Sequence, residues 1–228
     1  MNREAFRERL AARPLLLDGA MGTLLHAHGV SIDVCFDVMN VQNPAVVAEI
    51  HRGYIDAGAD IIETNSFGAN RFKLAEHILQ DDVVKINEAA VNVARRVISG
   101  SFKPVLLAGS VGPLGARLAP LGRISVEQAQ AAFAEQIGAL VNAQPQGVDL
   151  IILETMSDLK ELETAVSAAR SVAPDIPVIA QMTFTRDDRT LLGHTPDAVA
   201  RRLSQLDVDM IGVNCSGGPA QVLRLIAM

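Results

Sequence analysis

Apolar and polar residues follow one another in blocks along this chain, and the blocks have two different periods. Six short, nearly continuous apolar runs are typical of buried strands. A loop with glycine or polar residues follows each run, and a segment with apolar residues at helical spacing comes next. The predicted strands cover residues 14–17, 60–68 with its loop, 105–108, 149–153, 177–181 and 209–213. This alternation predicts an α/β fold with a parallel sheet that is buried on both faces.

Helix start signals agree with the alternation. Residues 3–12 predict a short helix before the first strand. Ser125 with Gln128 predicts a capping box, and Asp158 with Glu161 predicts a second capped helix start. No interdomain linker or low-complexity segment interrupts the series, so we treat residues 1–228 as one domain.

Two architectures share this pattern, an open doubly wound sheet and a (β/α)8 TIM barrel. The phosphate-binding pattern G-x-G-x-x-G does not follow the first strand. Barrels collect site residues from the ends of many strands, whereas open sheets bind ligands at one switch point. Five of the six predicted strands end in polar or reactive residues, namely Asp18, Glu63, Ser110, Glu154 and Asn214 with Cys215. We therefore predict a barrel, with about six of its eight βα units present and the carboxyl-terminal part missing.

Composition and charge exclude several classes of protein. The net charge is −6 and no Lys/Arg-rich tract occurs, so we expect no nucleic-acid partner. No apolar run approaches the roughly 18 residues of a membrane span, and the polar residues 1–13 do not form a signal peptide. Cys35 and Cys215 are the only cysteines, which fits a reducing cytoplasmic compartment better than a disulfide framework.

The strand ends carry the candidate chemistry. Cys215 follows the last strand and could be a metal ligand, a nucleophile or a buried apolar filler. The carboxylates of Asp18, Glu63 and Glu154 suit an amine-bearing ligand or acid/base chemistry. A glycosidase would use two such carboxylates, but this chain has one Tyr and no Trp to stack on a sugar. A single cysteine cannot hold zinc, even if His194 reaches the site, so the residue types alone give a weak metal signal.

Four motifs make the chain recognisable. The segments 17–23, 58–70, 147–155 and 212–215 read LDGAMGT, GADIIETNSFGAN, GVDLIILET and GVNC. In this order they closely resemble the homocysteine S-methyltransferase domain, as found at the amino terminus of cobalamin-dependent methionine synthase and of the bifunctional methylenetetrahydrofolate reductase type. The resemblance extends from about Leu15 to Pro219.

The resemblance implies a zinc-dependent enzyme that methylates the thiol of homocysteine and so produces methionine. Cys215 matches the family's first zinc ligand and is the expected catalytic residue, while the other two cysteine ligands are absent from this chain. Asp18 and Glu154 match the residues that bind the substrate ammonium. The glycine loop that begins at Gly19 would hold the substrate carboxylate, and Asn214 would shape the site.

In this family the zinc-bound thiolate attacks a methyl group. The donor is of the cobalamin, folate or S-methylmethionine type, and another domain would supply it. The alternative is a noncatalytic, truncated fragment that binds homocysteine but lacks the cysteine pair for zinc. In either case Cys35 is expected to be structural.

Overall fold

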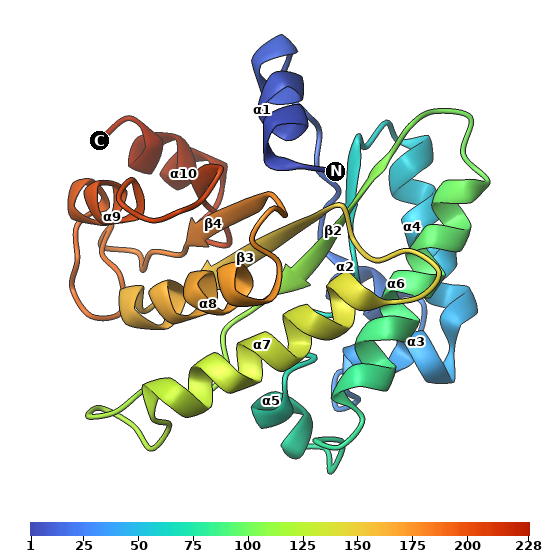
Figure 1. Cartoon of the computed structure of the whole chain (residues 1–228), viewed down its shortest axis with the longest axis horizontal. Coiled ribbons are helices and arrows are strands. Elements are labelled where there is room, and N and C mark those ends of the chain that lie inside the picture. Colours follow the sequence, from blue (N-terminus) through green and yellow to red (C-terminus); the bar gives the residue numbers. More distant parts are fainter.

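One parallel sheet runs through the centre of the molecule, and the computed structural model describes all 228 residues. The sheet order follows the chain order, β1-β2-β3-β4-β5, with every neighbouring pair parallel (Figure 1). A doubly wound sheet would reverse its order at a switch point, whereas a barrel adds each strand next to the preceding one. The strand order therefore confirms the barrel type of winding. The strands are β1 (Ile61–Glu63), β2 (Leu106–Val111), β3 (Leu150–Met156), β4 (Val178–Met182) and β5 (Met210–Val213).

The count of six strands was wrong by one. The segment 14–17 makes only an isolated parallel bridge, between Leu17 and Ile61. The amide of Asp18 donates to the carbonyl of Ile61 at 3.0 Å, so the segment still runs beside β1. Pro14 has no amide hydrogen, and the segment has β1 as its one strand partner, so the ladder stays too short to form a regular strand.

Helices cover the outer face of the sheet. In Figure 1, α6, α7 and α8 lie one after another along the sheet, in the order of the chain. The helices are α1 (Arg3–Ala12), α2 (Met21–Ala27), α3 (Met39–Gln42), α4 (Pro44–Asp56), α5 (Arg71–Ala75), α6 (Val83–Ser99), α7 (Val126–Asn142), α8 (Leu159–Val172), α9 (Pro196–Leu203) and α10 (Pro219–Ile226), with a 3-10 turn at Phe36–Val38. None of them has the length and apolar character that a membrane span requires.

Side chains alternate between two cores because successive strand residues point to opposite faces. Ile62, Leu107 and Ile151 belong to the large core between sheet and helices. Ile61, Leu106 and Leu150 belong to a smaller core on the inner face. Phe6 of α1 is fully buried in this inner core, at the amino ends of the strands. Helix α1 thus closes the end of the sheet opposite to the predicted site.

The helix start signals are confirmed with one correction. Ser125 and Gln128 form the predicted capping box at the start of α7. At the start of α8, Asp158 accepts from the amide of Lys160, but Glu161 does not complete a box. Its carboxylate instead accepts from the amide of Leu114 at 2.7 Å, a contact 47 residues away that helix signals do not predict.

Candidate functional site

A cavity of about 720 Å³ opens at the carboxyl ends of the strands. It is much larger than one amino acid and lies within the usual size of ligand sites. All the residues predicted for the site line it, namely Asp18, Gly19, Glu154, Asn214 and Cys215. Glu63 and Ser110 line it as well, so the tertiary structure brings together the polar ends of several strands.

Asp18 enters the cavity from the end of the segment beside β1. Its Oδ2 atom accepts from the amide of Glu63 at 2.9 Å, while its Oδ1 atom is buried and has no partner. Burial raises the pKa of Asp18 to about 7, and the charge of Glu154 adds to the rise. A carboxylate oxygen with a free acceptor site inside a cavity suits an incoming cation.

Gly19 follows in a tight loop that leads into α2, a helix that the sequence pattern did not predict. A Cβ atom at Gly19 would lie 3.0 Å from the hydroxyl of Tyr54. That hydroxyl donates to the carbonyl of Ala20 at 2.9 Å and so fixes the loop against α4. A larger residue at this position would therefore push the Tyr54 ring away by a few tenths of an ångström.

Glu154 is held by three side-chain donors at the end of β3. The hydroxyl of Ser110 donates to Oε1 at 2.6 Å, and the amide of Asn214 donates to Oε2 at 3.0 Å. The hydroxyl of Thr155 donates to Oε2 at 3.3 Å. These donors fix the orientation of the carboxylate.

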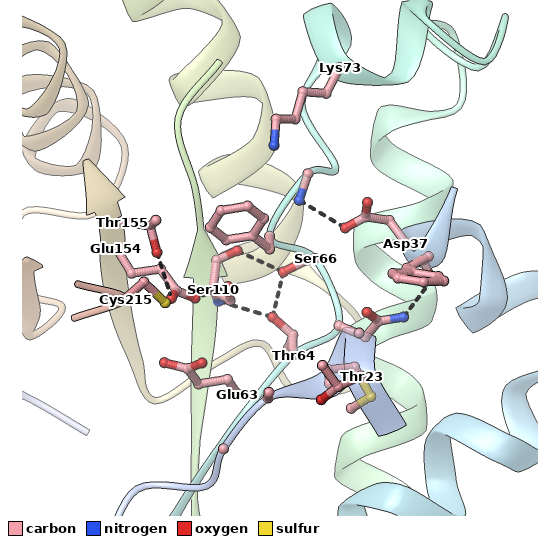
Figure 2. Close-up of a pocket in the computed structure, with 18 of the residues that line it drawn as sticks. Thr23, Asp37, Glu63, Thr64, Ser66, Lys73, Ser110, Glu154, Thr155 and Cys215 are labelled. Atoms are coloured by element: carbon pink, nitrogen blue, oxygen red, sulfur yellow. Dashed lines mark hydrogen bonds between the residues drawn. The ribbon is translucent and has the colours of Figure 1, made fainter. Parts of the chain in front are cut away.

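Cys215 is exposed and free, so the hypothesis of a buried apolar filler was wrong. The Asn214 side-chain amide lies 3.5 Å from its Sγ atom. Figure 2 shows Cys215, Glu154 and Thr155 side by side on one wall of the cavity. Cys215 and Thr155 both have positive φ angles, 48° and 58°. Such backbone strain in residues other than glycine is concentrated at functional sites.

The opposite wall carries a different set of groups. The Lys73 ammonium lies 4.6 Å from the centre of the Phe67 ring. Figure 2 places Lys73 and Asp37 across the cavity from Cys215. The amide of Gly68 donates to Asp37 at 2.9 Å, which ties this wall to the loop after β1. The cavity therefore has an acidic, thiol-bearing end and an end with aromatic rings and a lysine.

The residues of this chain do not form a metal site by themselves. No group of three or more His, Cys, Asp or Glu side chains is placed to hold a metal ion. His194 does not line the cavity, and Cys35 is buried with its Sγ atom 3.7 Å from Asp37. A zinc site needs three or four ligands, and this chain offers one exposed thiol in the cavity, that of Cys215.

Two supporting contacts were not predicted from the sequence. The sequence marked Ser110 only as a polar residue at a strand end, and in the structure its hydroxyl donates to Glu154. The amide of Thr155 donates to Asn214 at 2.8 Å and joins the ends of β3 and β5. Ser110 and Thr155 are both polar residues close to the end of a strand. That position was the one feature of the sequence that could have indicated their roles.

Comparisons with known proteins show the family of this chain. A sequence model described as homocysteine S-methyltransferase matches residues 15–228. Methionine synthase of Mycobacterium tuberculosis is 34% identical over 226 residues, which are 93% of this chain and 19% of that protein. Methionine synthase of Mycobacterium leprae is 33% identical over 228 residues, again 19% of its length. The chain thus spans about a fifth of the length of these relatives.

Solved structures show the same fold. The metallated form of the homocysteine methyltransferase MmuM from Escherichia coli superposes with a TM-score of 0.74 at 28% identity. That match covers 92% of this chain and 77% of the MmuM chain. The apo form of MmuM gives a TM-score of 0.67 at 30% identity, covering 88% and 72% of the two chains.

Proposed function

Because the chain belongs to the homocysteine S-methyltransferase family, we propose that it binds homocysteine in the cavity and takes part in methyl transfer to its thiol, giving methionine. One observation carries the proposal. Asp18 from the start of the chain, Glu154 from its middle and Cys215 near its end converge on one cavity at the carboxyl ends of the strands. This is where barrels build their active sites.

The substrate ammonium would lie between Asp18 and Glu154. Asp18 offers a buried oxygen without a partner, and Glu154 is oriented by three donors. The substrate carboxylate would bind the backbone of the loop at Gly19. Fixing both charged groups of the amino acid orients its side chain, and such orientation is a large part of catalytic rate enhancement.

Cys215 would be one of the ligands of a zinc ion, as the family resemblance implies. The chain contributes this one thiol, so zinc binding requires further ligands that residues 1–228 do not contain. We therefore assign no catalytic step to the metal. The methyl donor would come from another domain, and residues 1–228 would act as the homocysteine-binding domain.

The proposal is tested by replacing Cys215 in the full-length protein. Cys215→Ala is expected to reduce methyl transfer to homocysteine by at least about 100-fold, because the variant lacks the thiol that would be a ligand of the zinc ion. The matched control is Cys35→Ala, which removes the other cysteine and should retain most of the activity. Activity that survives Cys215→Ala would contradict the proposal.

The absence of a complete ligand set favours a second candidate for residues 1–228 on their own, a fragment that binds homocysteine without methyl transfer. Zinc content separates the two candidates. A stoichiometric zinc ion in the purified 228-residue chain, with activity, would exclude the noncatalytic fragment.

A further inference from the structure

Three carboxyl groups share one end of the cavity. Asp18, Glu63 and Glu154 all line it, and none of the three takes part in an ion pair. Ionisation of all three groups is unfavourable, because burial and each like charge nearby raise the energy of the charged forms. A proton on one of the three groups would relieve this repulsion.

The hydrogen-bond inventory identifies which group holds it. Glu154 accepts from Ser110, Thr155 and Asn214, and Asp18 accepts from the backbone amide of Glu63. The carboxyl group of Glu63 accepts from no protein donor. Donors stabilise the charged form of a carboxylate, so Glu63 is the group for which ionisation is least favourable.

The position of Glu63 gives that proton an acceptor. Figure 2 shows the carboxyl groups of Glu63 and Glu154 as neighbours in the cavity, and a protonated carboxyl group is a donor. Burial, then the charges of Glu154 and Asp18, raise the pKa of Glu63 well above its usual value, in agreement with the inventory. The other titratable groups that line the cavity are Asp37, Lys73, Glu76, His77, Cys35 and Cys215.

We propose that Glu63 is a positioning residue, a neutral carboxylic acid that donates a hydrogen bond to Glu154. It fixes this carboxylate for the substrate ammonium and does not pair with the ammonium itself. The inference rests on the proposed function, in which Glu154 binds the ammonium of homocysteine. With Glu63 neutral, two carboxylates face one ammonium, and the cavity avoids a third negative charge.

The protonation state is tested by infrared difference spectroscopy on the 228-residue chain near neutral pH. Subtracting the spectrum of Glu63→Gln from that of the wild type should leave a carbonyl band of a protonated carboxylic acid. Glu76→Gln is the matched control, because Glu76 is an exposed glutamate at the rim of the same cavity. It should remove only carboxylate bands. A Glu63→Gln difference with carboxylate bands alone overturns the assignment.

The positioning role is tested by steady-state kinetics in the full-length, zinc-loaded protein. The glutamine amide can still donate to Glu154, so Glu63→Gln should leave the KM for homocysteine within about threefold of wild type. Glu63→Ala removes the donor and should raise the KM about tenfold, with a smaller effect on kcat. If Glu63→Gln raises the KM as much as Glu63→Ala, Glu63 acts as a charged group and the proposal is overturned.

The two experiments separate this inference from the proposed function. An acid band at Glu63 in a full-length protein that does not methylate homocysteine overturns the proposed function and leaves the protonation state established. Normal methyl transfer without that band overturns the role of Glu63 and leaves the proposed function standing.

Discussion

At the scale of single residues, Asn214 joins the carboxylate of the site to its thiol. Its Oδ1 atom accepts from the amide of Thr155 at 2.8 Å, and its Nδ2 atom donates to Glu154 at 3.0 Å. The same Nδ2 atom lies 3.5 Å from Sγ of Cys215. An amide side chain both accepts and donates, which neither a carboxylate nor an apolar side chain can do. Asn214 thereby fixes the carboxylate and the thiol relative to one another.

The raised pKa of Asp18 predicts a pH dependence of activity. The ionised form is the one that binds an ammonium, and burial raises its pKa to about 7. For the full-length protein, kcat/KM for homocysteine should therefore fall as the pH is lowered through about 7. Asp18→Asn should lower kcat/KM by at least about tenfold and remove this part of the pH profile. An unchanged profile in the variant would assign the titration to another group.

The same shift predicts the opposite effect on stability. The folded chain binds the Asp18 proton more tightly than the unfolded chain, so Asp18 lowers stability as the pH rises from about 4 to about 7. Asp18→Asn should therefore raise the free energy of unfolding at pH 8 by about 4 kcal/mol, and by about half as much at pH 5. Urea unfolding of the 228-residue chain at both pH values measures the difference. The site thus keeps a carboxylate at a cost in stability.

At the scale of elements, helix α1 holds the two ends of the chain together. The carboxylate of Asp209, just before β5, is fully buried and pairs with Arg3 at 2.9 Å and Arg7 at 2.8 Å, both from α1. It also pairs with Arg170 of α8 at 3.1 Å and accepts from the amide of Val178 at 3.0 Å. One aspartate therefore ties α1, α8, β4 and β5 at the closed end of the sheet.

Replacing Asp209 should destabilise the fold far more than replacing its neighbour. Asp209→Ala removes a fully buried carboxylate and leaves the partly buried Arg3 and Arg170 without this partner, which costs about 3 kcal/mol of unfolding free energy. The matched control is Asp207→Ala. Asp207 also pairs with Arg3 and Arg170, but its side chain is 62% exposed, so the expected loss is below about 1 kcal/mol. Chemical denaturation measures both variants, and equal losses would contradict a central role for Asp209.

At the scale of the whole molecule, the sheet has two edges. Strand β5 pairs only with β4, and Met210 and Ile211 on β5 are 44% and 37% exposed. An apolar groove lies beside this edge, lined by residues of α9, β5 and α10 that include Ile211 and Leu225. Unpaired strand edges with apolar side chains favour association between chains.

The 228-residue chain should therefore self-associate through the β5 edge. We expect dimers or larger species at micromolar concentration, measured by sedimentation velocity, and a shift toward monomer in Ile211→Lys, because a charge disfavours edge pairing. Phe102→Lys is the matched control. Phe102 is fully exposed in the loop before β2, far along the chain from β5. A wild-type monomer, or an equal effect of both variants, would contradict the prediction.

Local sequence patterns determined much of this protein. The alternation of apolar runs and helical segments predicted the order of strands and helices, because strand and helix periods are properties of neighbouring residues. The polar residues at the strand ends, together with four motifs in order, led to Asp18, Glu154 and Cys215. All three lie in one cavity. The prediction of a regular strand at 14–17 was wrong, because the formation of an edge strand depends on its partner as much as on its own residues.

Tertiary structure decided what those residues contact. Ser110 reaches Glu154 across 44 residues of chain, and Asn214 reaches Glu154 across 60. Glu161 has helix-capping chemistry in the sequence, but in the fold it supports the amide of Leu114. The exposure of Cys215, the free oxygen of Asp18 and the lack of donors at Glu63 likewise depend on neighbours from distant segments. Hydrogen bonds and burial are set in space, so a local pattern can name the site residues but cannot assign their charges.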